Sequence, residues 1–315
     1  MIEIVRGGIL TTVQDLGRPG WQASGVPVGG ALDAMALRVA NAIVGNDDAA
    51  AGLECTVRGP VLRFLAPARI ALAGADVDGV AMRRPLQFAE GDELSLEKIR
   101  RGGRVYLAVA GGIAVPPVLG SRSTHLAGGF GGHEGRALRP GDRLPIGRAT
   151  NTKGFDGAPA RWSVAESMVP DVVAERLVLR AVAGPQEEWF GEEARQRFWG
   201  SEFVVTPQSD RMGLRLSGVA IELEERREMI SEPVAFGSVQ VPPDGQPIVL
   251  LADRQTLGGY PKIATVISAD APALARLRPG QRVAFGQVSL VEAQYHRMVM
   301  DTAFAALRAG LAEKS

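Results

Sequence analysis

The stretch "ISEPVAFGSVQVPPDGQPIVLLADRQTLGGYPKIATVI", residues 230–267, decides the fold. Short apolar runs in it are separated by Pro, Gly and Asp, a pattern typical of β-strands joined by turns. "PPDGQP" predicts a tight turn, because Asp244-Gly245 supplies the backbone conformations that a hairpin needs. The turn joins "GSVQV" to "PIVLLA", so the sequence predicts a β-hairpin with Gln240 and Asp253 on neighbouring strands.

The second strand of this hairpin ends in "LLADRQTLGGYPK", residues 250–262, where polar side chains replace the apolar pattern. A glycine pair lets backbone N–H groups approach a ligand that a Cβ would obstruct. The stretch therefore predicts the wall of a pocket for a polar small molecule. Its candidate binding residues are Gln240, Asp253, Gln255, Thr256, Gly258, Gly259, Tyr260 and Lys262. The alternative is a hydrogen-bonded turn in which Asp253 caps backbone amides.

A further group of candidates lies in "TPQSDRMGLRLSG", residues 206–218. Its two arginines, Arg211 and Arg215, have the planar fork that binds a carboxylate or phosphate through two parallel hydrogen bonds. They are predicted to bind an anionic group of the substrate. The alternative is a surface salt bridge between Asp210 and Arg211.

A glycine-rich loop, "GSRSTHLAGGFGGHEGRAL", spans residues 120–138. Loops of this kind can cradle phosphate groups, so Ser121, Arg122 and Thr124 are further candidate binding residues. The loop has no Gly-Lys-Ser/Thr, however, and its glycines do not fit the dinucleotide spacing. The alternative is a flexible surface loop.

Composition excludes several classes of protein. The hydrophobic share of 46% and charged share of 22% are typical of a soluble globular chain. The formal net charge is zero, so neither nucleic acid nor an anionic membrane surface is an expected partner. The N-terminus does not resemble a signal peptide, and no apolar run is long enough to span a membrane. With Cys55 as the single cysteine, we expect a reduced, cytoplasmic protein.

The chain of 315 residues is long enough for two domains. We expect an N-terminal β-rich domain over 1–160, with an early helix that Asp33 begins and Gly45 ends. We expect a C-terminal β-barrel domain over 161–315, ending in a long helix. A partial repeat, "LRPGDRLPIG" at 138–147 and "LRPGQRVAFG" at 277–286, places a Pro-Gly turn and a short strand in each half.

No metal site or covalent cofactor is expected. His125, His133 and His296 have no metal-ligand spacing, and one cysteine cannot form a zinc cluster. "VAMRRP" at 80–85 is similar to a biotin-carrier motif but has Arg83 in place of the lysine that is biotinylated. Cys55 is expected to be a buried, unreactive apolar side chain.

Five blocks along the chain resemble one family: "TTVQDLGRPGWQASGVPVGGALDAMALRVAN", "GGIAVPPVLGSRST", "GPQEEWF", "SDRMGLRLSG" and the 230–267 stretch. It is the allophanate hydrolase subunit 2 family, also called the biotin-dependent carboxyltransferase-like or Kip antagonist family. Within it, the chain is most similar to the branch that supplies the C subunit of prokaryotic ATP-dependent 5-oxoprolinases. The resemblance implies a mainly β fold with a few helices, in two cyclophilin-like β-barrel domains.

The resemblance also implies a hydrolase that is active only as a complex. The partners of this chain would be the B subunit, of the allophanate hydrolase subunit 1 (Kip inhibitor-like) family, and the A subunit of oxoprolinase. The complex would open the lactam of 5-oxoproline to glutamate and hydrolyse ATP, so ATP can bind somewhere in it. An amide gains reactivity only where developing charge is stabilised. Asp253 is therefore a candidate catalytic base, with Gln255, Thr256 and the Gly259 N–H as orienting groups.

Two other functions are open at this point. The chain could be a carboxyltransferase-type subunit, related to urea carboxylase, that acts with a biotinylated carrier encoded elsewhere. It could also be a regulatory antagonist that binds a Kip inhibitor-like partner. The genes next to it would discriminate among the three.

Overall fold

A computed structural model describes residues 1–149, 162–165, 176–225 and 228–312. The chain divides into two compact units. Unit 1 contains Met1–Arg18, Gly29–Val169 and Thr302–Ser315, and unit 2 contains Pro19–Val28 and Pro170–Asp301. The domain boundary expected near residue 160 falls in residues 150–161, which lie outside the described part of the chain.

Unit 1 contains two antiparallel sheets. One is five-stranded, in the order β2-β3-β8-β5-β6, and the other is four-stranded, in the order β7-β4-β1-β9. The strands are β1 (Ile2–Arg6), β2 (Leu10–Gln14), β3 (Gly52–Thr56), β4 (Val61–Phe64), β5 (Ala68–Val77), β6 (Leu86–Phe88), β7 (Glu93–Ser95), β8 (Ile99–Val109) and β9 (Arg143–Leu144).

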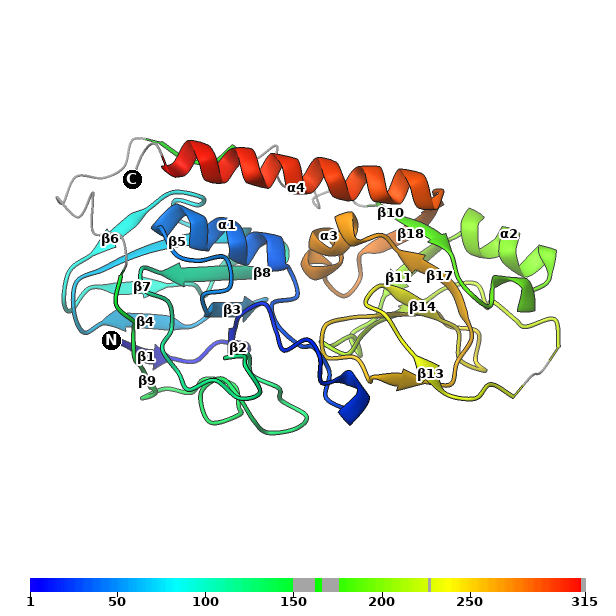
Figure 1. Ribbon diagram of the computed structural model, residues 1–315, viewed down its shortest axis with the longest axis horizontal. Helices are drawn as coiled ribbons and strands as arrows, with labels where there is room; N and C mark the ends of the chain where they lie inside the picture. Colours follow the sequence, from blue (N-terminus) through cyan, green and yellow to red (C-terminus); the bar gives the residue numbers. More distant parts are fainter. Residues whose placement is uncertain (150–161, 166–175, 226–227, 313–315) are drawn as a thin grey trace. The chain divides into compact units, whose positions relative to one another are not determined.

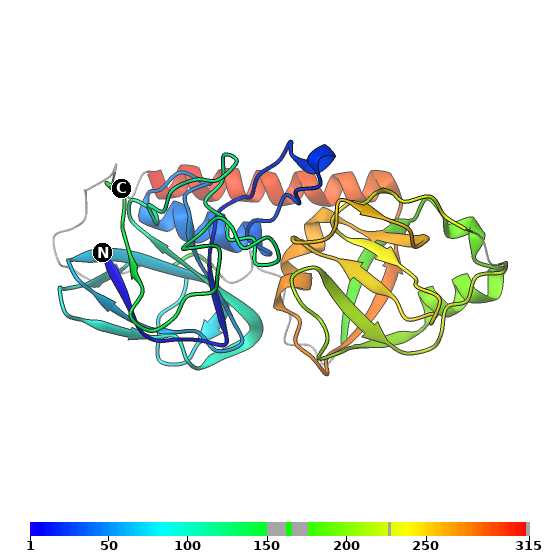
Figure 2. The same cartoon turned by 90° about the horizontal axis from the view of Figure 1, so that it is seen from below.

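The two faces of the five-stranded sheet in unit 1 pack against different partners. Ile70 and Leu72 of β5 join the core shared with the four-stranded sheet, whereas Ala71 and Ala73 join a second core with helix α1 (Ala34–Val44). This division follows from the two-residue period of a strand, and small alanines let a helix approach closely. Both ribbon views show α1 lying along β5 and β8 (Figures 1 and 2).

Helix α1 confirms the early helix expected from the sequence. The Asp33 side chain accepts a hydrogen bond from the Ala36 N–H at 2.8 Å, and Gly45 ends the helix with a φ of 78°. Cys55 lies fully buried in the core between the sheets, and burial raises the pKa of its thiol to about 12. It is therefore an unreactive apolar side chain, as expected.

Unit 2 contains a closed barrel of seven strands among the described residues, in the order β10-β17-β14-β15-β12-β11-β18. Its strands are β10 (Arg176–Ala183), β11 (Glu202–Val205), β12 (Gly213–Ser217), β14 (Ser238–Gln240), β15 (Ile248–Leu250), β17 (Lys262–Val266) and β18 (Arg282–Gln287). A separate pair is formed by β13 (Glu232–Pro233) and β16 (Leu257–Gly258). The expected mainly β fold is confirmed, and so is the β14–β15 hairpin.

Three further helices of the described residues are α2 (Glu192–Gly200), α3 (Ala271–Arg276) and α4 (Leu290–Ala312). Helix α2 packs on the barrel through Phe198, whose ring stacks on Phe285 with centroids 4.6 Å apart. The division between units falls inside α4, after Asp301. The second half of α4 buries Phe304 and Leu311 in the α1 core of unit 1. No helix in the described part of the chain is long and apolar enough to cross a membrane.

The two copies of the Leu-Arg-Pro-Gly repeat form the same turn. In unit 1, Gly141 has a φ of 89° and the Arg139 N–H donates to the Asp142 carboxylate at 2.7 Å. In unit 2, Gly280 has a φ of 89° and the Arg278 N–H donates to the Gln281 side chain at 2.7 Å. The turns lead into β9 and β18, so the repeat seen in the sequence is a repeat of local structure.

One difference between the two turns predicts a pH-dependent stability. Hydrogen bonds from Arg136 lower the pKa of Asp142 from 3.8 to about 2, whereas Gln281 does not titrate. The stabilisation by Asp142 is fully present above about pH 4 and is lost as the pH falls through about 2. We expect Asp142→Asn to lower the unfolding free energy of unit 1 by about 1–2 kcal/mol at pH 7, with the difference disappearing towards pH 2. Urea titrations at both pH values measure it, and an equal difference at both would contradict it.

Candidate functional site

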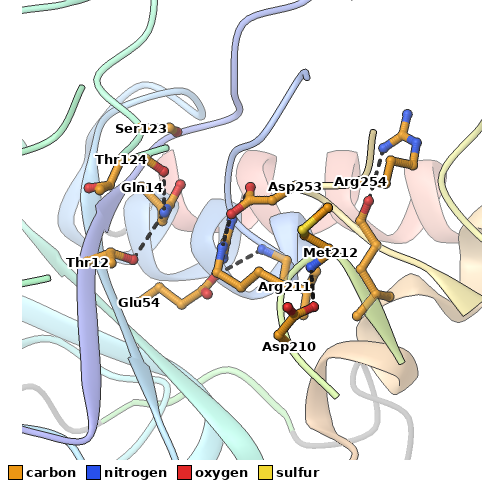
Figure 3. Close-up of polar contacts among 12 residues, drawn as sticks. Thr12, Gln14, Glu54, Ser123, Thr124, Asp210, Arg211, Met212, Asp253 and Arg254 are labelled. Carbon is orange, nitrogen blue, oxygen red and sulfur yellow. Dashed lines mark hydrogen bonds and ion pairs between the residues drawn. The ribbon is translucent and has the colours of Figure 1, made fainter. Parts of the chain in front are cut away.

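Arg211 and Asp253 form a buried ion pair in unit 2. Arg211 precedes β12 and Asp253 follows β15, and these strands pair antiparallel with Gly213 opposite Leu250. The Arg211 Nε donates to Asp253 Oδ2 at 2.8 Å and Nη2 donates to Oδ1 at 3.2 Å. Figure 3 shows the guanidinium and the carboxylate facing each other. The exposed fractions of the two side chains are only 4% and 6%. Two residues that the sequence suggested for separate roles therefore contact each other directly.

This geometry limits what Asp253 does. The guanidinium fork engages both carboxylate oxygens, so abstraction of a proton by Asp253 would require opening a buried ion pair. The arrangement favours a fixed carboxylate that orients Arg211 over a freely available base. The backbone supports the pair, because the Asp253 N–H donates to the Arg211 carbonyl at 2.9 Å. The neighbouring Asp210 instead accepts the N–H groups of Met212 and Gly213 at 2.8 and 3.0 Å.

A second buried charge, Lys262, lies at the start of β17. Its side chain is 4% exposed, and its ammonium pairs with the carboxylate of Glu232 on β13. The Gln186 side-chain Nε2 also donates to that carboxylate at 2.9 Å, and the Gln186 side-chain Oε1 accepts the backbone N–H of Lys262 at 3.1 Å. The hydrogen bonds from Lys262 and Gln186 lower the pKa of Glu232. The charge on Lys262 is thus balanced inside the protein.

Two carboxamides meet beside the glycine pair. The Gln255 Nε2 donates to Gln240 Oε1 at 3.3 Å, and the Gln240 Nε2 donates to the Tyr260 carbonyl at 3.3 Å. Gln240 is buried and Gln255 is half-buried. A Cβ on Gly258 would lie 2.6 Å from the Gln240 Nε2. The space beside Gly258, where the sequence predicted the close approach of a ligand, is therefore filled by the Gln240 side chain.

The remaining residues of this stretch lie at different depths. Thr256 is partly buried, and its carbonyl accepts the Val234 N–H at 3.2 Å. Gly259 is exposed, and the Tyr260 side chain is also exposed, at 45%. The half-buried Gln255 and the backbone of Tyr260 therefore bond to the buried Gln240 within the chain, and binding of a ligand by this stretch stays a prediction.

The glycine pair yields a matched prediction. Neither glycine has a positive φ, so an added Cβ acts only through space. Gly258→Ala should displace Gln240 and lower the unfolding free energy by about 1–3 kcal/mol. Gly259→Ala should change it little, since its Cβ would lie 3.3 Å from the nearest atom, the Ser231 Oγ. The thermal unfolding midpoints of the two variants measure this difference in stability. Equal midpoints would contradict the crowding at Gly258.

Arg215 lies apart from these groups. It is exposed on β12 between the buried Leu214 and Leu216, as the two-residue period requires. Arg211 is buried and precedes the strand, so the two arginines do not form one anion-binding pair. The Arg215 backbone exchanges hydrogen bonds with the Ser209 hydroxyl at 3.0 and 3.2 Å.

In unit 1, the start of the glycine-rich loop folds around Asp15. The Ser121 and Ser123 hydroxyls each donate to Asp15 Oδ1 at 2.6 Å, and the Arg122 N–H donates to Oδ2 at 2.6 Å. The Gly17 N–H adds a fourth hydrogen bond at 2.8 Å. The Ser121 hydroxyl is thus used by the loop itself, although the sequence suggested that it binds a phosphate.

The other candidates of this loop also have internal contacts. The Thr124 hydroxyl donates to the Val13 carbonyl at 3.0 Å, and the exposed Arg122 donates from Nε to the Val115 carbonyl at 2.8 Å. Gln14 donates to the Thr12 hydroxyl and the Thr124 carbonyl at 3.0 and 3.2 Å (Figure 3). The guanidinium of the buried Arg18 lies 5.0 Å from the Phe130 ring centre. This part of the loop is an internally bonded structure.

Sequence reasoning missed Gln186 and Glu232, which balance Lys262. "GPQEEWF" and "SEP" carry no spacing that relates them to residue 262, because only the folding of unit 2 brings β13, β17 and the Gln186 turn together. The signal in the sequence that could have pointed to these residues was the presence of polar side chains where apolar strands end. No group of at least three His, Cys, Asp or Glu side chains in the described ranges is arranged to hold a metal ion.

This chain is similar to proteins of one known family. A family model described as "Carboxyltransferase domain, subdomain A and B" matches residues 24–287. The C subunit of the 5-oxoprolinase of Escherichia coli (strain K12) is 43% identical over 302 residues, which cover 93% of each chain.

Two solved structures are also similar. The K. lactis urea amidolyase superposes with a TM-score of 0.88 at 29% identity, over 96% of this chain but 20% of that chain. The protein TTHA0988 superposes with a TM-score of 0.77 at 36% identity, over 90% of this chain and 55% of that chain. Both solved structures are longer polypeptides, of which this chain matches one part.

Proposed function

Because this chain belongs to the carboxyltransferase domain family, subdomains A and B, we propose that it is the C subunit of an ATP-dependent 5-oxoprolinase. The complex opens the lactam of 5-oxoproline to glutamate with hydrolysis of ATP. The observation that carries the proposal is the 43% identity to a protein of that name, over nearly the full length of both chains. The enzyme is a hydrolase acting on a cyclic amide.

The polar groups of unit 2 suit a lactam. A lactam presents an N–H donor and a carbonyl acceptor on one edge, and a carboxamide offers the complementary pair. Gln255 is half-buried, and its contact with Gln240 fixes its orientation. We assign the lactam edge to Gln255, with Thr256, Gly259 and Tyr260 beside it. The substrate carboxylate fits the charge of Arg211, which Asp253 holds in place.

The partners follow from the same proposal. The B subunit, of the Kip inhibitor-like family, and the A subunit complete the complex, and ATP binds within the assembly without a covalent cofactor on this chain. We place the complex in the cytoplasm, where its substrate and ATP are present.

Omission of single components tests this function. The three purified subunits should together convert 5-oxoproline to glutamate in the presence of ATP, and leaving out any one should abolish turnover. Glutamate and ADP are measured in the same reaction, because lactam opening coupled to ATP requires both. Turnover by this chain alone, or no turnover by the full mixture, would contradict the proposal.

The superposition on urea amidolyase favours a second candidate, a carboxyltransferase-type subunit that acts with a biotinylated carrier. The chain spans only 20% of that enzyme, so the activity of the whole enzyme does not transfer directly. The same mixture, supplied with carboxybiotin carrier and urea in place of 5-oxoproline and ATP, discriminates the two. A regulatory antagonist would bind the Kip inhibitor-like protein and give turnover with neither substrate.

A further inference from the structure

Three cationic side chains lie on or next to the polar stretch that follows β15, and one of them differs from the other two. The Arg211 and Lys262 side chains are each 4% exposed, and each has a carboxylate partner, Asp253 and Glu232 respectively. Arg254 has hydrogen bonds to carbonyl groups, but no carboxylate of the described residues pairs with it. Its positive charge is therefore not balanced by a counter-charge in this part of the chain.

Backbone carbonyl groups hold the Arg254 side chain in place. Its Nε donates to the Val234 carbonyl and its Nη1 to the Leu251 carbonyl, both at 3.1 Å. Figure 3 shows the guanidinium apart from the Arg211–Asp253 pair. The side chain is half-buried, and burial lowers the pKa of the guanidinium. An arginine nevertheless keeps its charge at neutral pH, so the site presents a fixed cation with further N–H groups that can bind an anion.

Arg254 lies close to the carboxamide to which we assigned the lactam edge. Val234, whose carbonyl accepts the Arg254 Nε, donates from its N–H to the Thr256 carbonyl at 3.2 Å. A Cβ on Gly258 would lie 3.0 Å from the Val234 Cγ1 and 3.3 Å from the Gln255 Nε2. Val234 therefore adjoins both the guanidinium and the space beside Gln255.

Opening a lactam creates negative charge at an oxygen that is neutral in the substrate. Water adds to the carbonyl carbon, so a C–O bond forms and the π electron pair of the C=O bond moves to the oxygen. The ring C–N bond then breaks, both protons of the water end on the nitrogen, and the carbonyl carbon becomes a carboxylate of glutamate. A fixed cation at this oxygen stabilises the transition state more than the neutral substrate, and that difference accelerates the reaction.

We propose that Arg254 is a catalytic residue whose guanidinium donates to the lactam carbonyl oxygen and stabilises the negative charge that develops there. A carboxylate paired with Arg254 would cancel this effect, which agrees with the lack of one among the described residues. Gln255 binds the lactam edge beside it. This inference rests on the proposed function for the identity of the substrate.

Two ligands of the three-subunit complex test the charge without turnover. They are 5-oxoproline and its cyclic phosphonamidate analogue, in which an anionic PO₂ group replaces the ring carbonyl. Calorimetry without ATP should show that the wild-type complex binds the analogue at least about 10²-fold more tightly than 5-oxoproline. Arg254→Gln should remove most of this preference. With ATP present, it should lower kcat about 10²–10³-fold and change the KM for 5-oxoproline less than about threefold.

Two further variants serve as comparisons. Arg254→Lys keeps the charge with fewer N–H donors, and should retain more of kcat and of the preference for the analogue than Arg254→Gln. Arg197→Gln is the matched control. It removes an exposed arginine of α2 in the same unit, and should change neither quantity more than about twofold. Thermal midpoints of the variants show whether the fold is intact.

The outcomes separate the residue from the function. An Arg254→Gln complex with wild-type kcat and an unchanged preference for the analogue overturns the inference and leaves the proposed function standing. A rise in KM alone also overturns it, because such a change shows a role in substrate binding only. If the wild-type complex does not open 5-oxoproline, the proposed function fails. A preference for the analogue that Arg254→Gln removes then still supports the inference, and no preference overturns it as well. If Arg254→Gln does not fold, the wild-type preference and Arg254→Lys decide, and an analogue bound no more tightly than 5-oxoproline overturns the inference.

Discussion

Asp253→Ala should lower the unfolding free energy of unit 2 by about 3–5 kcal/mol, because it removes the carboxylate that accepts two hydrogen bonds from the buried Arg211 guanidinium. The sequence suggested that Asp253 is a candidate catalytic base, a role whose loss would affect turnover more than stability. The ion pair changes that expectation, since both side chains are almost fully buried. Trp189 and Trp199 lie in unit 2, so tryptophan fluorescence during urea unfolding measures the effect.

Two variants define this result further. Asp210→Ala removes a neighbouring carboxylate that accepts the backbone N–H groups of Met212 and Gly213, and should cost about 0.5–2 kcal/mol, as for a lost cap. Arg211→Met/Asp253→Leu removes both charges and should recover most of the loss, because no buried charge is then left unpaired. An Asp253→Ala protein as stable as the wild type would show that the ion pair contributes little.

A further variant, Asp253→Asn, separates stability from catalysis. If Asp253 acts in proton transfer, or positions Arg211 on the substrate, Asp253→Asn should lower turnover per folded molecule of the complex about 10²–10⁴-fold. The two roles differ in pH dependence: a base gives a pH–rate profile that disappears in the variant, whereas a positioning carboxylate leaves its shape unchanged and raises KM. Unchanged turnover per folded molecule would make the pair purely structural, and the site would have to lie elsewhere.

Asp15→Ala should lower the unfolding free energy of unit 1 by about 3–5 kcal/mol. The Asp15 carboxylate accepts four hydrogen bonds, two of them from the buried hydroxyls of Ser121 and Ser123. Removing it leaves these donors without their acceptor, and each buried, unsatisfied polar group costs about 1–3 kcal/mol. The loss should appear as a lower thermal midpoint and as faster amide hydrogen exchange at residues 121–124.

Asp92→Ala provides the comparison within unit 1. Asp92 is exposed and accepts a backbone hydrogen bond from the Ala89 N–H at 2.7 Å, so its loss should cost at most about 1 kcal/mol. Two equal midpoints would show that the Asp15 cluster does not stabilise the loop. Protection of residues 121–124 by phosphate or ATP in the wild-type chain would instead support the phosphate role that the sequence suggested.

The local pattern of the sequence was sufficient for the elements of the fold. Asp33 and Gly45 determined the ends of α1, because caps act within one turn of a helix. Asp244-Gly245 determined the β14–β15 hairpin, and the Pro-Gly pairs at 140 and 279 determined two identical turns. These signals depend only on neighbouring residues, so they can be read without the fold. The ordered blocks of sequence likewise identified the family, which the match over residues 24–287 confirms.

Only the tertiary structure decided which polar residues meet. Arg211 and Asp253 are 42 residues apart in the sequence, and only the pairing of β12 with β15 makes them an ion pair. Asp15 reaches Ser121 and Ser123 across more than a hundred residues, and Glu232 on β13 reaches Lys262 on β17. A charged residue looks the same in sequence whether its partner is a substrate or another side chain. Burial and distance distinguish the two cases, and both are properties of the folded chain.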